Sequence, residues 1–239
     1  MTTRLSGRTA VVTGASRGIG AAIASALGGE GARVVMLARN EAKLKEAARG
    51  VKGSIPLTCD VSDPKSVDKA TKQIEKELSG APDMLVNNAG IFGVSIVEET
   101  TTDSFVQTIN TNLVGPFLFA RAFLADMKKR KSGHIVTIGS IADRTIFTGN
   151  AAYSAAKFGL RAVHEVLRAE LRGTGVRASL ISPASTDTEI WNSVTVTDPV
   201  GKPHSTRPLL SRDDVVAAVL FVLIQPERVN IDELRLSHS

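Results

Sequence analysis

Residues 8–20 read RTAVVTGASRGIG, and this stretch decides the fold of the chain. Its first part, Arg8–Thr13, is an apolar run rich in β-branched residues, which is typical of a strand buried on both faces. Glycines follow at positions 14, 18 and 20, and the Ala-, Ile- and Leu-rich run Gly18–Gly28 predicts a helix. A strand, a glycine-rich turn and a helix in this order predict the start of a βαβ unit that can bind a pyrophosphate at the helix N-terminus.

The glycine spacing leaves a structural alternative open. It is G-x-x-x-G-x-G rather than G-x-G-x-x-G, and a tight strand-to-helix turn needs glycine for its own sake. The position of the loop directly after the first strand favours the cofactor interpretation. The residues expected to bind the pyrophosphate are Gly14, Ser16, Arg17, Gly18, Ile19 and Gly20.

Apolar strands alternate with helical patterns along the rest of the chain. This alternation predicts an α/β fold, a doubly wound, Rossmann-like parallel sheet of about seven strands with helices on both faces. Further strands are expected at Arg33–Ala38, Ile55–Cys59, Met84–Asn87, His134–Ile138, Val176–Ile181 and Leu234–Leu236. Further helices are expected after Ser62, from about Asn110 to Lys131, from about Ala151 to Arg172, and from Ser211, which forms a capping-box pattern with Asp214.

The chain shows no internal repeat, linker or shift in composition, so one domain is expected over residues 1–239. The connections between the expected strands and helices are short, except for Pro183–Pro208, where apolar residues show little helical or strand periodicity. A connection of that length in a compact domain is usually a lid or a binding loop. A substrate loop is therefore expected at about residues 184–208.

The composition excludes several classes of protein. The single cysteine, Cys59, cannot form an internal disulfide and suggests a reducing compartment. The longest apolar run, Val215–Ile224, is about half the length of a membrane-spanning helix. The segment Met1–Gly7 lacks the apolar core of a signal peptide. A cytoplasmic location without a membrane partner is expected.

The charge is basic, with 29 Lys and Arg against 24 Asp and Glu and a formal net charge of +5. The dense basic run Lys128–Lys131 has no interleaved aromatic residues that would stack on bases, so it is interpreted as the solvated C-terminal end of a helix. The 4 histidines have no metal-ligand spacing. Neither a nucleic-acid partner nor a metal is expected.

The end of the second strand bears on the choice of cofactor. Enzymes that prefer NAD usually place an acidic residue there for the ribose 2′-hydroxyl, but this chain reads Ala38-Arg39-Asn40. Arg39, together with Arg17 in the glycine loop, can flank a 2′-phosphate through charge-assisted hydrogen bonds. The pair favours NADP(H), against the alternative that both are ordinary surface charges.

Tyr153, the single tyrosine of the chain, and Lys157 are expected on one face of a helix at an i,i+4 spacing. A cation beside a phenol stabilises the phenolate, so a lowered tyrosine pKa and an acid/base role are expected. Ser140, at the end of the fifth strand, can hydrogen-bond a substrate carbonyl at the carboxyl edge of the sheet. Because Tyr-x-x-x-Lys alone is common on helix surfaces, this serine adds weight to the catalytic interpretation.

The ordered set of motifs resembles the short-chain dehydrogenase/reductase family. The set comprises the glycine loop, Cys59-Asp60-Val61, Asn87-Asn88-Ala89-Gly90, Thr111-Asn112-Leu113, Ser140, Tyr153 with Lys157, and Pro183. The resemblance implies that Asp60 and the adjacent Val61 bind the adenine end, and that Asn88, Ala89 and Gly90 support the sheet and the cofactor ribose. It also implies that Tyr153 is the general acid/base, Ser140 orients the carbonyl, and Lys157 lowers the tyrosine pKa and binds the nicotinamide ribose.

The resemblance further implies that Asn112 holds a water in a proton relay, and the Asn-Leu-x-Gly context favours it over Asn110. Thr188 after Pro183 fits the contact with the nicotinamide amide. Two features depart from the family pattern: Ala184 replaces a common glycine, and the chain ends without a Gly-Gly tail. A homodimer or homotetramer, built through the Tyr153 helix and the one after it, is also implied.

The function expected is the NADP(H)-dependent interconversion of a carbonyl and a secondary alcohol, with a non-catalytic dinucleotide-binding regulator or scaffold as the alternative. The substrate pocket is expected from Ile91–Val94, Ile141–Thr148 and the loop around Trp191. Phe92, Phe147 and Trp191 favour an apolar substrate, although core packing accounts for them equally well. Arg144 and His204 are candidates for meeting a polar substrate group, but surface positions are favoured for both.

Overall fold

The computed structural model describes residues 3–193 and 209–239. Its seven strands form one parallel sheet in the order β3-β2-β1-β4-β5-β6-β7. The strands are β1 (Thr9–Thr13), β2 (Arg33–Ala38), β3 (Ile55–Thr58), β4 (Met84–Asn87), β5 (Gly133–Ile138), β6 (Val176–Pro183) and β7 (Glu233–Leu236). The predicted doubly wound sheet is confirmed.

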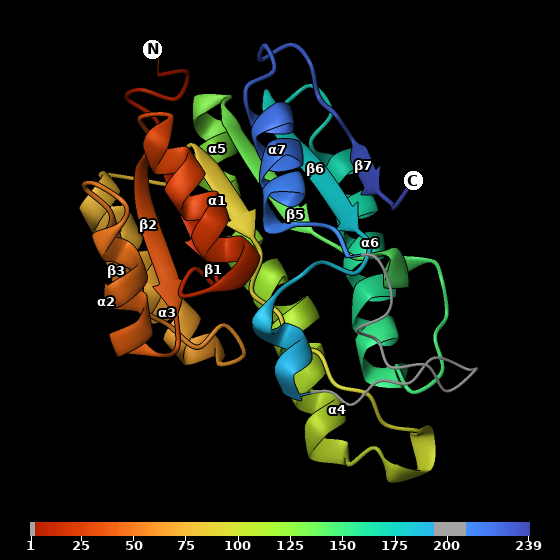
Figure 1. The fold of residues 1–239 in the computed structure, drawn as a ribbon. Coiled ribbons are helices and arrows are strands. Elements are labelled where there is room, and N and C mark those ends of the chain that lie inside the picture. Colours follow the sequence, from red (N-terminus) through yellow and green to blue (C-terminus); the bar gives the residue numbers. More distant parts are fainter. Residues whose placement is uncertain (1–2, 194–208) are drawn as a thin grey trace.

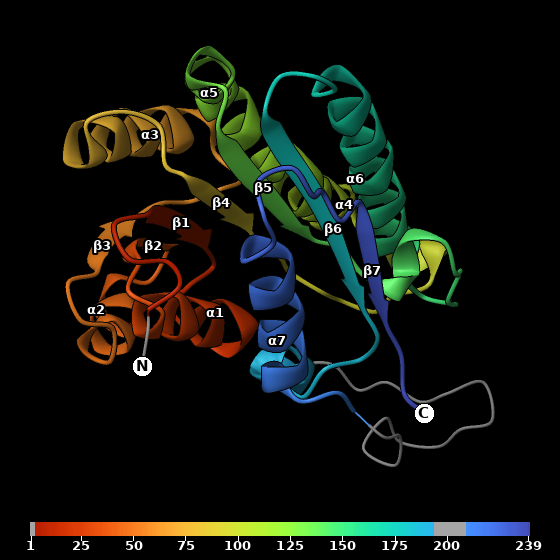
Figure 2. The same cartoon turned by 90° about the horizontal axis from the view of Figure 1, so that it is seen from above.

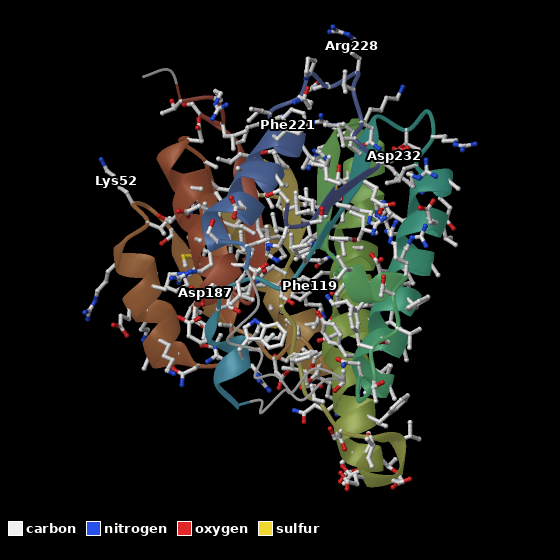
Figure 3. All side chains as sticks on the ribbon, turned by 45° about the vertical axis from the view of Figure 1, so that its right-hand side comes forward. Lys52, Phe119, Asp187, Phe221, Arg228 and Asp232 are labelled. Carbon is white, nitrogen blue, oxygen red and sulfur yellow. The ribbon has the colours of Figure 1, made fainter. Side chains whose placement is uncertain are left out.

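Helices cover both faces of this sheet (Figure 2). On one face α1 (Gly18–Gly29), α2 (Glu41–Arg49) and α7 (Arg212–Leu223) enclose a core of aliphatic side chains. On the other face the core lies under α3 (Pro64–Leu78), α5 (Gly115–Arg130) and α6 (Ala151–Glu170). Figure 3 shows Phe119 of α5 in the interior and Phe221 of α7 on the outside, where it is 49% exposed.

The long helix expected from about Asn110 begins earlier and is not regular. Helix α4 (Thr102–Ile109) is capped by Thr101, whose side chain accepts from the Ser104 amide. A π-helical turn, η2 (Asn110–Val114), then joins α4 to α5. Pro116 follows in the first turn of α5, and proline has no N–H to donate, so the regular hydrogen-bond ladder is interrupted here. The predicted start at Asn110 is therefore wrong.

Two predictions about helix ends are confirmed. Ser211 and Asp214 form a reciprocal capping box at the start of α7. The basic run lies at the end of α5, where Lys131 is the C-cap in the left-handed region, with φ 55°. Cations there complement the helix dipole and the free carbonyl groups.

The order of the strands sets the position of the functional edge. Strands β2 and β3 lie on one side of β1, whereas β4 to β7 lie on the other. The chain therefore leaves β1 and β4 in opposite directions, which opens a crevice beyond their carboxyl ends. In Figure 1 the strand arrows point toward this edge, where α4 and the short helix η4 (Glu189–Ser193) lie. Among the described residues, no helix has the length and apolar character needed to cross a membrane.

Candidate active site

A cavity of about 970 Å³ lies at the carboxyl edge of the sheet. Its walls come from the loops after β1 to β6, from Thr111 of η2 and from the first turns of α6. The predicted site residues that line it are Gly14, Ser16, Arg17, Gly18, Ile19, Gly20, Arg39, Val61, Asn88, Ala89, Gly90, Ser140, Tyr153, Lys157, Pro183 and Thr188.

The glycine loop packs tightly against the loop after β4. A Cβ on Gly14, whose φ is +68°, would lie 2.8 Å from the Ala89 Cα, and a Cβ on Gly20 would lie 2.3 Å from the Gly14 carbonyl oxygen. The Asn88 side-chain amide donates to the Thr13 carbonyl oxygen at 2.9 Å. Two glycines are thus required by the protein's own packing, and Asn88 holds the loop in place.

The cofactor end of the cavity fits an anion. Helix α1 begins after Arg17 without a capping side chain and without an acidic residue in its first turn. Its first amide groups and its dipole can therefore meet a phosphate. The exposed side chains of Arg17, Arg39 and Lys43 also border this end. Their charges suit a dinucleotide with an additional phosphate.

Two predicted site residues do not line the cavity. The Asp60 carboxylate accepts from the amide and the hydroxyl of Ser62, at 2.9 and 2.6 Å, so it stabilises the turn after β3. Asn112 is buried, and its side chain makes two 2.8 Å hydrogen bonds with the backbone of Ile91. The cavity wall near these two residues is formed by Cys59, Val61 and Thr111 instead.

Three of the four predicted catalytic side chains, Ser140, Tyr153 and Lys157, come together at the other end, and Asn112 does not line the cavity. Ser140 follows β5 and caps the short helix η3 (Ile141–Asp143), with its hydroxyl accepting from the Ala142 amide at 3.1 Å. Tyr153 lies in the first turn of α6. Lys157, one turn later, is buried; its ammonium donates to the Ile138 carbonyl oxygen at 2.9 Å and lies 5.6 Å from the centre of the Tyr153 ring.

The pKa of Tyr153 differs from the expectation. Burial raises the pKa of Tyr153, a hydrogen bond with Ser140 opposes this rise, and the charge of Asp143 adds to it. Burial also lowers the pKa of Lys157 to about 8, with Asp143 acting in the opposite direction. The predicted lowering of the tyrosine pKa is therefore wrong, because desolvation of the phenolate outweighs the hydrogen bond with Ser140. The phenol is protonated at neutral pH.

Apolar side chains form the wall beside Tyr153. The Phe92 ring meets both Tyr153 and Trp191 edge-on, with 4.9 Å between ring centres in each pair. The Trp191 indole N–H donates to the Thr186 carbonyl oxygen at 2.9 Å, which fixes the ring. The other apolar lining residues are Ile91, Val94, Ile96, Ile141, Ile146, Phe147 and Ile190. The segments predicted for the substrate pocket therefore border the cavity.

Other expectations for this end have mixed outcomes. The Arg144 guanidinium pairs with Asp143 and Glu233 and does not line the cavity, so its suggested role toward substrate is wrong. The Ala184 amide donates to the Leu236 carbonyl oxygen at 2.8 Å, and its backbone is outside the left-handed region, so glycine is not required there. His204 and most of the predicted 184–208 loop lie outside the described residues.

Four side chains at or near the site were not predicted. Asn40 and Lys43 border the cofactor end, and their signal is their position just after Arg39 at the end of β2. Glu189 borders the cavity beside Gly18. Asp143 lies behind Ser140 with only 1% of its surface exposed. No sequence pattern marks these two acids, because their places depend on how η3 and η4 fold back onto the sheet.

Comparison with known proteins gives consistent results. A family model described as short chain dehydrogenase matches residues 8–198. The chain is 35% identical over 234 residues to an uncharacterized oxidoreductase of Staphylococcus aureus (strain USA300), covering 97% of each. It is 37% identical over 240 residues to a glycine betaine reductase of Emericella nidulans, covering 96% of this chain. The chain spans 18% of the length of that reductase.

A solved structure is similar over the whole fold. A metagenomic short-chain oxidoreductase in complex with NADP has a TM-score of 0.82 and 33% sequence identity, covering 99% of this chain and 100% of that one. The chain therefore belongs to the short-chain dehydrogenase/reductase family of oxidoreductases. No cluster of metal-ligating side chains occurs among residues 3–193 and 209–239.

Proposed function

We propose that this protein is an NADP(H)-dependent oxidoreductase that interconverts a carbonyl and a secondary alcohol. The observation that carries the proposal is the layout of one cavity. Ser140, Tyr153 and Lys157 converge at one end, and the open N-terminus of α1 with Arg17 and Arg39 lies at the other. A dinucleotide spanning the cavity would connect the two ends.

The choice of NADP(H) rests on charge. Arg17 and Arg39 are exposed cations at the cofactor end, and Lys43 adds a third there. A 2′-phosphate carries close to two negative charges and gains charge-assisted hydrogen bonds from such groups. The similar metagenomic oxidoreductase was solved in complex with NADP, which supports the same choice here.

In the direction of reduction, the chain's residues handle the carbonyl oxygen. Bound reduced nicotinamide supplies the hydride for the carbonyl carbon. Ser140 donates a hydrogen bond to the carbonyl oxygen, and Tyr153 donates its phenolic proton to that oxygen as the C–H bond forms. Lys157 stabilises the phenolate that remains until a proton from solvent replaces the one transferred. The raised pKa of Tyr153 keeps the phenol in the form that reduction requires.

The walls near Tyr153 favour an uncharged, apolar substrate. The charged groups among the described lining residues are Arg17, Arg39, Lys43, Lys157 and Glu189. Three of these border the cofactor end, Lys157 is engaged behind Tyr153, and Glu189 lies beside Gly18. The remaining wall is aromatic and aliphatic, so a carboxylate or phosphate on the substrate would lose hydration without gaining a partner.

The exposed apolar residues at the mouth extend this surface. Val94 and Ile96 are 36% and 41% exposed, and Ile146 and Phe147 are 73% and 37% exposed. The segment that carries Val94 and Ile96 is joined to the segment after Ile146 and Phe147 by a single β-bridge between Ser95 and Asn150. Exposed apolar residues grouped at the rim of a cavity are typical of a binding site. A substrate with a bulky apolar group would cover them.

The test is oxidation of NADPH with a panel of carbonyl compounds. Neutral aryl and alkyl ketones and aldehydes should be reduced, and matched keto acids should react more slowly by about tenfold or more. Each active compound is repeated with the Tyr153→Phe variant as a control. Absence of NADPH oxidation with every compound, together with tight NADPH binding, would support the regulator or scaffold instead.

We further infer a homodimer or homotetramer working in the reducing cytoplasm. Exposed apolar residues on α4, α5 and α6 support the homodimer or homotetramer. They are Phe105, Val106, Phe117, Phe158 and Val166. The free, buried thiol of Cys59 fits the reducing cytoplasm. Light scattering after gel filtration tests the assembly, because a monomer at micromolar concentration would contradict it.

A further inference from the structure

Asp143 is a buried carboxylate directly behind the catalytic serine, and the mechanism above does not use it. Its side chain is 0% exposed. One carboxylate oxygen accepts from the Ser182 hydroxyl at 2.5 Å, and the other accepts from the Arg144 Nε at 2.6 Å. Its backbone amide donates to the Ser140 carbonyl oxygen at 3.0 Å. Asp143 therefore joins the Ser140 turn to strand β6.

The contact extends to the C-terminal strand. The Arg144 guanidinium also pairs with the Glu233 carboxylate on β7. Gly139 makes room for the Asp143 carboxylate and the Ser182 hydroxyl. A Cβ at this position would lie 2.8 Å from the Ser182 hydroxyl and 3.3 Å from the Asp143 carboxylate. We call Asp143, Arg144, Ser182 and Glu233 the Asp143 cluster. It holds η3, β6 and β7 together behind the site.

The Asp143 cluster carries more negative than positive charge. Two carboxylates share one guanidinium, and the Ser182 hydroxyl is neutral. A buried carboxylate is costly unless it is fully hydrogen-bonded, and an asparagine could join the same elements without that cost. Among the described residues, Tyr153 and Lys157 on α6 are the titratable groups on which its charge acts, and the exposed Arg235 on β7 is the backbone register partner of Ser182.

The charge of Asp143 acts on both groups of the catalytic pair. It raises the pKa of Tyr153, in the same direction as burial. It also raises the pKa of Lys157, against the burial that lowers it to about 8. Without Asp143 the ammonium would lose its proton more readily and the phenol would ionise at lower pH. Both effects maintain the protonated pair near neutral pH.

We propose that Asp143 is a positioning residue for the catalytic pair. Its buried carboxylate lies against Gly139, between Ile138, whose carbonyl oxygen accepts from Lys157, and the Ser140 turn, and its charge acts on Tyr153 and Lys157 from there. Glu233 on β7 holds that carboxylate in place through Arg144. The proposal rests on the proposed function, since it assigns a role in the same reaction. It makes the C-terminal strand a part of the active site, although no β7 side chain lines the cavity among the described residues.

The ionisation of Tyr153 can be measured directly, because Tyr153 is the single tyrosine of the chain. Phenolate absorbance in the near ultraviolet therefore titrates this residue alone, without substrate or cofactor. In Asp143→Asn, which keeps a hydrogen-bond acceptor but removes the charge, we expect the Tyr153 titration to move about one pH unit lower. The alkaline fall in kcat for carbonyl reduction should move in the same direction by a similar amount.

Ser182→Ala is the matched control. It removes the hydrogen bond to Asp143 and retains the charge, so activity or stability is expected to fall while the Tyr153 titration stays within about 0.3 pH unit of the wild type. Glu233→Gln removes one carboxylate from Arg144 and should give a smaller shift in the same direction as Asp143→Asn. This variant tests the proposal even if Asp143→Asn does not fold.

An unchanged titration in both Asp143→Asn and Glu233→Gln would overturn the proposal. So would an equal shift in Ser182→Ala, because that result would indicate a structural role. If the wild type reduces carbonyls through Tyr153 while neither charge variant shifts the titration, only the Asp143 proposal fails. If the titration shifts but no carbonyl is reduced, the proposed function fails and the electrostatic coupling stands.

Discussion

The two edges of the same sheet both bury titratable side chains, but among the described residues only the carboxyl edge has a large cavity. At the carboxyl edge, buried Lys157 lines a cavity of about 970 Å³, and buried Asp143 lies behind the lining residue Ser140. At the amino edge, the buried His134 Nε2 lies 2.9 Å from the Ser179 hydroxyl. Arg177 there donates to the carbonyl oxygens of Gln225, Pro226 and Val229 after α7. Its guanidinium therefore holds the segment that follows that helix.

The comparison shows that burial of an ionisable group does not by itself mark function. His134 has its pKa lowered to about 3, chiefly by burial and then by the charges of Arg177 and Arg8. It is therefore neutral at physiological pH and behaves as a polar core residue. Burial also lowers the pKa of Lys157, to about 8, but Lys157 shares a large cavity with Ser140 and Tyr153. His134 and Arg177 border a cavity of only about 20 Å³, so the size of the cavity separates the two edges.

The largest expected effect is at the carboxyl edge. Tyr153→Phe removes the transferable proton and keeps the ring, so turnover should fall at least about a hundredfold while NADPH binding is retained. Steady-state kinetics and a fluorescence titration with NADPH measure the two quantities. The stability to urea should stay close to the wild type. If Tyr153→Phe reduces carbonyls at near the wild-type rate, Tyr153 is not the proton donor, and the catalytic role assigned to the carboxyl edge is wrong.

The next effect belongs to the amino edge and concerns stability alone. Because the His134 pKa is about 3 in the folded chain and about 6.5 in the unfolded chain, only the unfolded chain takes up this proton between those values. The neutral His134 side chain therefore contributes to the free energy of unfolding above pH 6.5, and this contribution declines as the pH falls toward 3. The loss amounts to about 2 kcal/mol at pH 5.

His134→Gln should remove this part of the pH dependence. Urea unfolding at pH 7 and pH 5 gives the difference in free energy for each protein, and the difference should be about 2 kcal/mol smaller in the variant. Activity at pH 7 in the folded variant should be unchanged. Equal pH dependence in both proteins would show that His134 is not buried as a neutral group.

Cofactor choice tests the exposed part of the carboxyl edge, where solvent weakens each charge. The wild type should prefer NADPH over NADH by about tenfold or more in kcat/KM, since about 1.4 kcal/mol corresponds to one factor of ten. Arg39→Asp should reduce or reverse this preference and leave NADH turnover largely intact. Arg49→Asp, at the far end of α2, is the control for surface charge. A variant that still strongly prefers NADPH would contradict the assignment.

The smallest expected effect concerns the apolar wall. Phe92→Leu keeps an apolar side chain but loses two edge-on ring contacts, each worth about 0.5–1.5 kcal/mol. The kcat/KM for an aryl ketone should fall by about threefold to tenfold, and that for a short alkyl ketone should fall less. Phe221→Leu on the outer side of α7 is the matched control. An equal loss with both ketones would indicate general damage rather than recognition.

Local patterns were sufficient for the architecture and for much of the site. Alternation of apolar strands and helices predicted the sheet, and the glycine loop after β1 predicted where a phosphate can bind. Ser140, Tyr153 and Lys157 were predicted from helix spacing and from a position at a strand end. Each of these signals is carried by residues that are close in sequence, which is why reading along the chain finds them.

The sequence by itself determined most of the side chains that reach the carboxyl edge, because the end of each strand and the periodicity of each helix follow from neighbouring residues. Only the tertiary structure decided their protonation and their partners. The direction of the Tyr153 pKa shift, the bonds of Asn112 with Ile91, and the pairing of Arg144 with Asp143 and Glu233 all depend on segments far apart in the chain. Desolvation and charge act through space, and the distances that set them exist only once the chain has folded.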